Sequence, residues 1–268
     1  MKRVTLAAAM SIALLVIAST AALAGHVTGV RRLPVAALPR ATDLSQWNPE
    51  FAPTPASSAV SPVATAPGTT ELVSALPGAA YITYWPDPSQ PVIGELSVTT
   101  WGGPTVRPVV ASMGDFLEIR LDSRPNGSTA WVRKEDVTVS TTPYRIVISV
   151  SQRRLTLLDA GSAVYSAPVG VGQPQWATPT GPSFVDAKVP TPPSQRYIYG
   201  PLVIITGTHS NVFTDFDGGD GTVGIHGYPS DPASTMGVAS SHGCIRANPT
   251  TIATISVVPV GTPIDINA

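Results

Sequence analysis

The sequence predicts a mostly β protein with one short helix, preceded by a segment without regular structure. Glycine and proline number 23 and 28, well above their usual share, and such a composition disfavours long helices. From residue 81 onward, short apolar runs alternate with turn residues, as expected for strands. Hydrophobic residues make up 43% of the chain, which is enough to bury a core.

The charge of the chain narrows the classes of function. Lys and Arg total 16 and Asp and Glu total 17, so the net charge is −1, and charged residues are only 12% of the chain. A nucleic-acid-binding protein needs a basic surface to neutralise phosphates, so we expect no nucleic-acid partner. The single cysteine, Cys244, excludes an intramolecular disulfide and a metal site built from several cysteines.

Residues 1–24 are typical of a signal peptide. Lys2 and Arg3 precede an uncharged stretch, and small residues at Ala22 and Ala24 form a cleavage pattern. An uncleaved membrane anchor is the alternative, since about 20 apolar residues can span a bilayer. In either case we expect the remainder to be exported and to lie in the cell wall or periplasmic space.

Residues 25–78 are expected to form a linker. Proline recurs through this segment among Ala, Ser and Thr, and no helical or alternating apolar pattern persists. A segment of this composition cannot bury enough apolar surface to offset the entropy lost on ordering. We therefore interpret it as a spacer that carries the folded part away from the membrane or into the cell wall.

Residues 79–140 are predicted to form a small β domain. Five short strands are expected, at residues 81–84, 96–99, 106–111, 116–121 and 130–132. The Asn126-Gly127 pair between the last two is typical of a two-residue hairpin turn, because both residues tolerate a positive φ. The run at residues 130–137 resembles the closing motif of bacterial SH3-like domains. That resemblance implies a small SH3-like barrel that binds the cell wall.

Residues 143–268 are predicted to form a second β domain. Strands are expected at residues 145–150, 154–158, 163–165, 202–206, 222–225 and 258–266. The beginning of one helix is well marked: Asn248 can cap the free amides, Pro249 suits the first helical position, and residues 250–255 follow.

The residues with the most reactive side chains lie between His226 and Cys244. Cys244 follows His242 by two positions, within the run Ser-His-Gly-Cys-Ile-Arg at residues 241–246. A thiol has a pKa of about 8.5 and needs a neighbouring base or cation to become a nucleophile. Histidine can accept the thiol proton near neutral pH and return it later. These residues therefore indicate a cysteine nucleophile.

Two other interpretations of the same residues remain open. Zinc accepts the ligand types of His226, His242 and Cys244, although their spacing matches no common zinc motif. Alternatively, Cys244 is a buried structural thiol that behaves as a small hydrophobic side chain, with both histidines at the surface.

The cysteine motif closely resembles that of the L,D-transpeptidases, the YkuD family of bacterial cell-wall enzymes. The run at residues 241–246 and the preceding His226-Gly227 pair carry this resemblance, which extends over residues 144–267. Further matching segments, in chain order, are residues 145–150, 152–157, 177–181, 199–200 and 261–264.

The resemblance implies a fold and a reaction. The family has a β-sandwich-like catalytic domain with its cysteine in a groove under a mobile flap. The implied partner is a peptidoglycan stem peptide. Cys244 would attack the third residue of a tetrapeptide stem, expel the terminal D-Ala and form a thioester. An amine of a neighbouring stem would then take the acyl group and give a 3→3 cross-link. No cofactor and no metal are implied.

The same resemblance assigns roles to individual residues. Cys244 matches the nucleophile, His226 the general base, and His242 a second histidine that lines the site. Gly243 matches the oxyanion-hole segment. Arg246 either holds a substrate carboxylate or clamps a neighbouring loop. The remaining positions at which substrate contact is expected are Ser241, Gly227 and Tyr199. For Tyr199, as for Trp176, aromatic packing under the flap is the alternative.

The sequence leaves the acceptor open. Water as acceptor would make the protein a carboxypeptidase, and a protein amine would make it an enzyme that attaches proteins to the wall. A non-catalytic wall-binding protein is a further alternative, against which the intact cysteine and both histidines count.

Two other features are interpreted as structural. Residues 215–221 resemble the beginning of a calcium loop, but the fifth position is Gly219 and the twelfth is His226 instead of Glu, so we expect a solvated turn. His209 has no companion in the sequence and is expected to be packed or to lie in a loop.

Overall fold

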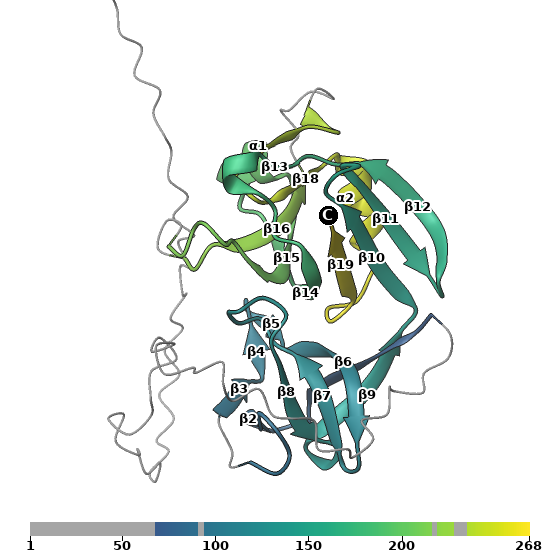
Figure 1. Cartoon of the computed structure of the whole chain (residues 1–268), viewed down its shortest axis with the longest axis vertical. Helices are drawn as coiled ribbons and strands as arrows, with labels where there is room; N and C mark the ends of the chain where they lie inside the picture. Colours follow the sequence, from purple (N-terminus) through teal and green to yellow (C-terminus); the bar gives the residue numbers. More distant parts are fainter. Residues whose placement is uncertain (1–67, 91–93, 216–218, 228–234) are drawn as a thin grey trace, which may run out of the picture. The chain divides into compact units, whose positions relative to one another are not determined.

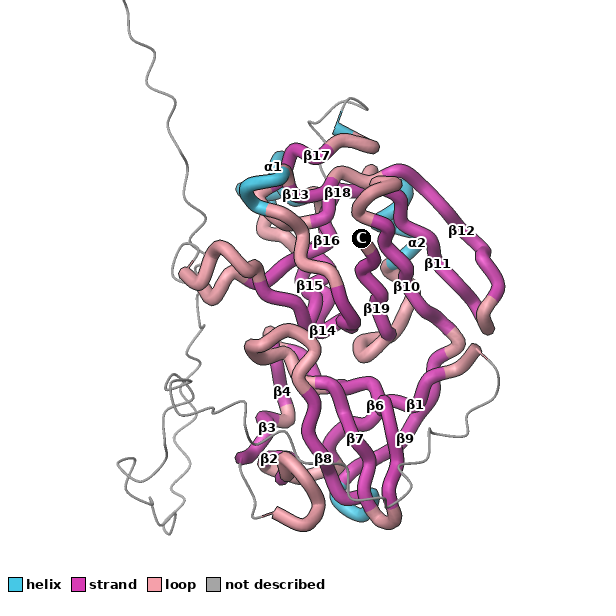
Figure 2. The backbone as a smooth tube through the Cα atoms, viewed as in Figure 1, coloured by secondary structure: helices cyan, strands magenta, loops and turns pink. Residues whose placement is uncertain are grey.

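The computed structural model describes residues 68–90, 94–215, 219–227 and 235–268, and all of them belong to one compact unit. Strands dominate this part of the chain (Figure 1, Figure 2), which confirms the predicted mostly β fold. The expected signal peptide or anchor, residues 1–24, and the expected linker up to residue 67 lie outside the described residues. Within the described part, no helix is long and apolar enough to cross a membrane.

A five-stranded antiparallel sheet, in the spatial order β8-β7-β6-β1-β9, forms the first part of the described chain. Its strands are β1 (Thr70–Ala75), β6 (Val106–Met113), β7 (Phe116–Arg120), β8 (Thr129–Arg133) and β9 (Val137–Thr142). Smaller elements are the pairs β2 (Tyr81–Tyr84) with β3 (Gly94–Ser97) and β4 (Thr99–Thr100) with β5 (Gly103–Pro104), and the 3-10 turn η4 (Lys134–Asp136). The predicted strands are present here, and the resemblance to an SH3-like barrel stays a prediction.

The predicted domain boundary at residue 79 is too late. Strand β1 lies inside the segment expected to be linker, and it pairs with β9 from Thr70↔Thr142 onward. Leu72 and Val73 are both buried: Val73 belongs to the core of this sheet, and Leu72 lies beside Gly261. Because each face of β1 is covered by a different part of the protein, two apolar residues suffice to fix it, and no alternating pattern reveals it in the sequence.

The predicted hairpin between β7 and β8 is present, but its loop is longer than two residues. Arg120 pairs with Thr129, and the Leu121 N–H donates to the Ser128 carbonyl, so residues 122–127 form the loop. A turn closes it, in which Ser128 N–H donates to Pro125 O and Gly127 has φ +84°. We call this loop, together with Leu121 and Ser128 that close it, the β7–β8 loop (residues 121–128).

An eight-stranded sheet forms the second part, in the order β12-β11-β10-β19-β14-β15-β16-β18. Its strands are β10 (Tyr144–Ser149), β11 (Arg154–Asp159), β12 (Ser162–Pro168), β14 (Gly181–Pro190), β15 (Leu202–His209), β16 (Thr222–Gly227), β18 (Ile245–Ala247) and β19 (Pro263–Asn267). The short strands β13 (Val171–Gly172) and β17 (Ala239–Ser241) pair separately. Figure 1 shows β19 between β10 and β14, where it joins the two halves of the sheet.

The described residues contain two short α-helices, where the sequence predicted one. The predicted helix is α2 (Pro249–Ile255), and the Thr251 N–H donates to Asn248 Oδ1 over 2.7 Å, as expected for a cap. Ile252 and Ile255 of α2 are buried in the core of the eight-stranded sheet. The second helix, α1 (Arg196–Tyr199), is a single turn that follows the 3-10 turn η6 (Pro193–Gln195). A turn this short has no apolar periodicity from which to predict it.

The two sheets meet around a buried ion pair. Arg107 of β6 is 1% exposed and lies against the Asp186 carboxylate of β14. The Asp122 carboxylate of the β7–β8 loop lies 3.0 Å from the same guanidinium, whose carbon lies 4.9 Å from the centre of the Phe184 ring. The attraction to these two carboxylates offsets part of the cost of taking the Arg107 charge out of water.

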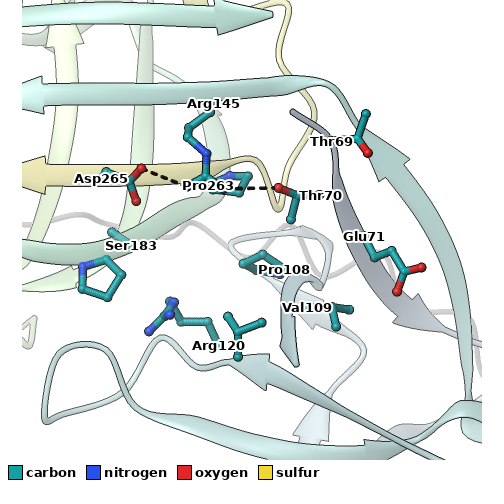
Figure 3. A pocket seen from close by; sticks show the side chains of 12 residues that line it. Thr69, Thr70, Glu71, Pro108, Val109, Arg120, Arg145, Ser183, Pro263 and Asp265 are labelled. Carbon is teal, nitrogen blue, oxygen red and sulfur yellow. Dashed lines mark hydrogen bonds and ion pairs between the residues drawn. The ribbon is translucent and has the colours of Figure 1, made fainter. Parts of the chain in front are cut away.

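A cavity of about 320 Å³ also lies where the sheets meet (Figure 3). The Arg145 guanidinium in it donates to Asp265 over 2.9 Å and to Thr70 Oγ1 over 3.4 Å, as the dashed lines in Figure 3 show. The predicted catalytic residues do not line this cavity. The candidate active site is therefore elsewhere, at the edge of the eight-stranded sheet.

Candidate active site

The strands β16 and β18 bring the two parts of the cysteine motif together. They pair in parallel, with Ile225↔Ile245 and His226↔Arg246 as neighbours. Cys244 directly precedes β18, and Arg246 of this strand is the neighbour of His226. The register therefore brings the segments that carry Cys244 and His226 side by side, although 18 positions separate the two residues in the sequence.

His226 is buried, and a backbone carbonyl orients its ring. Its Nδ1 lies 3.0 Å from the carbonyl oxygen of Gly227, and the side chain is among the buried polar groups of the core. Because a carbonyl only accepts, Nδ1 carries the proton, which leaves Nε2 as the basic nitrogen. The pKa of His226 is lowered to about 4: burial is the main cause, the hydrogen bond to Gly227 opposes it, and the positive charge of Arg246 adds to the lowering. The imidazole is therefore a neutral base at physiological pH.

Cys244 is the one cysteine of the chain and is half-buried. Burial raises the pKa of its thiol, while a backbone hydrogen bond from Gly224 and the charge of Arg246 lower it. Gly224 stands opposite Cys244 in the continued register of β16 and β18. A Cβ at Gly224 would lie 3.0 Å from Val203, so this position accepts no larger side chain without displacing β15. The resting sulfur is a thiol, and its activation requires that its proton be removed during the reaction.

The Ser241 hydroxyl holds the turn that presents Cys244. Ser241 Oγ donates to the carbonyl of Cys244 over 2.5 Å and accepts from the N–H of Gly243 over 3.1 Å. Gly243 has φ +121°, a conformation that favours glycine. Ser241 is only 1% exposed. The substrate contact predicted for Ser241 stays a prediction; in this conformation its hydroxyl is committed to the turn.

The same hydrogen bond bears on the predicted oxyanion hole. In this conformation the Gly243 N–H donates to Ser241 Oγ, whereas an oxyanion hole needs N–H groups aimed at the substrate oxygen. The oxyanion-hole role of Gly243 stays a prediction, and in the structure this glycine provides the backbone conformation of the turn.

His242 lies at the exposed rim of the site, among aromatic rings. Its ring stacks on Trp176 with centroids 4.0 Å apart and an interplanar angle of 27°. Phe213, in the loop between β15 and β16, lies 6.1 Å from both His242 and Trp176, measured between ring centroids. Trp176 ends the 3-10 turn η5 (Pro174–Trp176). The packing expected for Trp176 is present, and it fixes the plane of the His242 ring.

Tyr199 and Gly227 are both in contact with the buried histidine. The Tyr199 ring stands edge-on to the His226 ring, with centroids 5.0 Å apart and an interplanar angle of 73°. Gly227 is buried, and its carbonyl is the partner of His226 Nδ1. A Cβ at Gly200 would lie 3.2 Å from the Cα of Gly227, so α1 approaches β16 closely at this point. The substrate contact predicted for Gly227 stays a prediction; in the structure the carbonyl of this residue orients His226.

Arg246 is half-buried and acts electrostatically on both reactive groups. Its backbone pairs with Gly170 in both directions, at 2.8 and 2.9 Å, and its Nη1 donates to Ser240 Oγ over 3.2 Å. Its charge lowers the pKa of both His226 and Cys244. The predicted carboxylate contact and the predicted loop clamp are both compatible with this position.

Three further predictions concern the zinc arrangement, the segment that resembles a calcium loop, and His209. Within the described residues, no group of three or more His, Cys, Asp and Glu side chains is placed to hold a metal ion, so the zinc arrangement considered from sequence is not formed there. The segment resembling a calcium loop lies partly outside the described residues. His209 is buried, as expected for a packed residue, but it has partners: Asp220 at Nδ1 and the Asp122 carbonyl at Nε2.

Comparison with known sequences decides the family. The family model for the L,D-transpeptidase catalytic domain, YkuD, matches residues 143–266. A Bacillus subtilis protein named as a candidate L,D-transpeptidase, YkuD, is 34% identical over 128 residues, which are 47% of this chain and 68% of that protein. Its namesake in Bacillus licheniformis is 31% identical over 127 residues, 47% of this chain and 67% of that protein.

This chain belongs to the L,D-transpeptidase family. Among solved structures, an L,D-transpeptidase from Mycobacterium smegmatis matches 73% of this chain and 99% of that chain, with 18% sequence identity and a TM-score of 0.38. A protein of Bdellovibrio bacteriovorus matches 47% of each chain, with 23% identity and a TM-score of 0.37. The family assignment depends on the sequence matches, and the structural scores add no argument to it.

The L,D-transpeptidase domain has supporting residues that sequence reasoning did not single out. Thr178 is 3% exposed; it donates to the Gly243 carbonyl over 2.8 Å and accepts from the Gly172 N–H over 2.9 Å. It therefore ties the cysteine turn to β13. Thr178 lies in the matching segment at residues 177–181, which was the available signal. Phe213 had no such signal, because only the fold brings it to His242.

Proposed function

We propose that this chain is an exported cysteine L,D-transpeptidase that acts on peptidoglycan stem peptides through a thioester on Cys244. The observation that carries the proposal is the parallel register of β16 and β18, in which His226 pairs with Arg246, two residues after Cys244. The family assignment supports the reaction class, and the neutral His226, whose Nε2 is the basic nitrogen, supports the choice of base.

The first half-reaction forms the thioester. The Cys244 sulfur attacks the carbonyl carbon of the third stem residue while its proton passes to His226 Nε2. The tetrahedral intermediate collapses, the bond to the nitrogen of D-Ala breaks, and His226 returns the proton to that nitrogen. Since His226 begins neutral and ends neutral, this half-reaction needs no external base.

The second half-reaction releases the enzyme. The side-chain amine of a diamino acid on a neighbouring stem attacks the thioester carbon, and His226 accepts a proton from that amine. The bond from carbon to sulfur breaks, the thiolate regains the proton, and a 3→3 cross-link results. His242 lies at the rim of the site, where its exposed ring is suited to contact an incoming amine.

The proposal includes a location and a wall contact. The uncharged stretch at residues 4–24 behind Lys2 and Arg3 supports export, and a stem peptide as substrate requires it. The resemblance of residues 130–137 to SH3-like domains supports attachment of the first sheet to the wall.

Acylation by a carbapenem tests the nucleophile. We expect intact-protein mass spectrometry to show one added drug mass on the wild-type chain and none on Cys244→Ala, because the β-lactam carbonyl is attacked by the same sulfur. His226→Ala should slow acylation by roughly 100- to 10,000-fold, since it removes the base. Circular dichroism verifies that both variants are folded. A well-folded wild-type protein without adduct would contradict the proposal and favour a non-catalytic wall-binding protein.

A purified disaccharide tetrapeptide identifies the acceptor. Cross-linked dimer is the expected product, because an amine of a second stem takes the acyl group. Tripeptide with free D-Ala would instead show transfer to water, and so a carboxypeptidase. Unchanged tetrapeptide in the presence of an acylable Cys244 would show that the acceptor is a different amine.

A further inference from the structure

The loop that carries Phe213 is held by side chains from the first sheet. This loop joins β15 to β16, and its described residues are 210–215 and 219–221; we call these the β15–β16 loop. It lies against the β7–β8 loop, whose Arg124 and Asn126 both reach it.

Arg124 binds three backbone carbonyls of the β15–β16 loop. Its Nη1 donates to Ser210 O over 2.7 Å, and its Nη2 donates to Phe213 O over 3.1 Å and to Asp220 O over 2.6 Å. The three carbonyls come from both ends of the loop. One planar guanidinium therefore fixes the two ends relative to each other, which a single point charge on a flexible chain does less well.

Asn126 anchors the strand that leads into the loop. Its Nδ2 donates to the His209 carbonyl over 2.7 Å, and its Oδ1 accepts from the His209 N–H over 2.8 Å. The Asn126 amide thus makes the two backbone hydrogen bonds to His209 that a neighbouring strand would make at the end of β15. The His209 ring continues the contact, because its Nε2 lies 2.8 Å from the Asp122 carbonyl and its Nδ1 pairs with Asp220.

The held loop reaches the active-site rim through one side chain. Inside the loop, Ser210 Oγ accepts from the Phe213 N–H over 3.0 Å, so the residue that starts the loop also sets the backbone of Phe213. The Phe213 ring then lies 6.1 Å from both His242 and Trp176. Contacts therefore run without interruption from Arg124, through the carbonyl of Phe213, to the ring beside His242.

We propose that Arg124 and Asn126 are positioning residues for the transpeptidase reaction: they hold Phe213 against His242 and so shape the rim at which the acyl donor and the acceptor meet. The inference rests on the proposed function. It assigns to the first sheet a part in the reaction that is separate from any contact with the wall. Because both residues act through Phe213, neither needs to touch the substrate.

The test is a double-mutant cycle on the rate of carbapenem acylation of the full chain. Arg124→Met keeps the length of the side chain and removes its donors; Phe213→Leu removes the ring. We expect each single variant to lower the second-order rate constant by roughly 10- to 100-fold, as displacement of a site by about 1 Å can do. The double variant should be no slower than Phe213→Leu alone, since Arg124 acts through that ring. Arg124→Lys should recover part of the loss.

Two further variants make the test specific. Arg133→Met is the matched control, because Arg133 is an exposed arginine of β8 whose ion pair is with Glu135 of the following turn η4; we expect wild-type rates from it. Asn126→Ala, which removes two hydrogen bonds without a charge, should behave like Arg124→Met and replaces it if Arg124→Met does not fold. Thermal unfolding measures the folded state of each variant.

The outcomes separate the two proposals. Folded Arg124→Met and Asn126→Ala proteins that acylate at the wild-type rate would overturn this inference alone. Losses from Arg124→Met and Phe213→Leu that multiply in the double variant would also overturn it, since the two residues would then act independently. Absence of an adduct on the wild-type chain would overturn the proposed function and this inference with it.

Discussion

Individual residues of the site are held in neutral forms. Burial raises the pKa of Cys244 and lowers that of His226 to about 4, so the resting pair is a thiol and an imidazole. An ion pair of thiolate and imidazolium would have the opposite shifts. The charge of Arg246 favours the thiolate but disfavours the imidazolium, and so it does not stabilise that ion pair as a whole. The thiol must therefore lose its proton during the reaction itself.

This arrangement predicts the pH dependence of acylation. Lowering the pH removes the base only when His226 becomes protonated, so the rate of carbapenem acylation should stay level from about pH 8 to about pH 5 and fall near pH 4. Stopped-flow absorbance of the β-lactam measures this rate. A fall near pH 6.5, the usual pKa of histidine, would show that burial does not govern His226.

Arg246 provides a second check on the same profile. Removal of its positive charge in Arg246→Met should raise the pKa of His226 and move the acid limb to higher pH. Arg154→Met is the control, since Arg154 is an exposed residue of β11 that donates to Ser166. An unchanged limb in Arg246→Met would mean that its charge does not reach the imidazole.

At the scale of elements, α2 supports the strand that carries the base. Its Ile252 and Ile255 belong to the core of the eight-stranded sheet, and the helix packs against β16. The helix has only seven residues, so its cap is a large share of its local stabilisation.

Removal of that cap should destabilise the protein measurably. Asn248→Ala takes away the acceptor of the Thr251 N–H, and we expect the free energy of unfolding to fall by about 0.5–2 kcal/mol. Urea denaturation followed by circular dichroism measures the change. Thr250→Ala, an exposed neighbour in the same helix, should stay within about 0.5 kcal/mol of wild type. Equal stabilities for the two variants would show that the cap contributes little.

The elements that the sequence predicted are those with local signals. The strands of the apolar runs and the Asn248-capped helix follow from patterns within a few residues. Strand β14 was not predicted, because Pro182, Asp186 and Pro190 interrupt its apolar pattern, and its burial depends on Arg107, far away in the chain. The site divides in the same way. Cys244 and His226 were found from their motif, whereas the contact of Phe213 with His242 arises only from the fold.

At the scale of the whole described unit, a buried charge lies between the two sheets. Arg107 pairs with Asp186 and Asp122, and its Nε has no hydrogen-bond partner within the described part of the chain. Burial raises the pKa of Asp186, and the Arg107 charge opposes that rise. Loss of either partner would leave an uncompensated charge in the interior.

The ion pair predicts a large effect on stability from a small substitution. Asp186→Asn should lower the free energy of unfolding by about 3–5 kcal/mol, because it leaves Arg107 buried without its main partner. Asp265→Asn is the matched control: the Arg145–Asp265 pair is more than one-third exposed, and such pairs contribute about 0–1 kcal/mol. Thermal and urea denaturation compare the two variants. A similar loss of stability in both variants would show that the buried Arg107 pair contributes no more than the exposed pair.

A single residue, Pro143, connects β9 to β10, and its carbonyl accepts from the Ala160 N–H over 2.9 Å. A connection of one residue leaves the two strands no freedom to move apart. A designer who wished to replace the first sheet with an unrelated adhesive module would have to recreate the partners of Asp186 and of the β15–β16 loop as well. Fusion of another domain at this junction would expose the Asp186 carboxylate and leave the carbonyls of the β15–β16 loop without the donors of Arg124. The two sheets should therefore be exchanged between homologues only together.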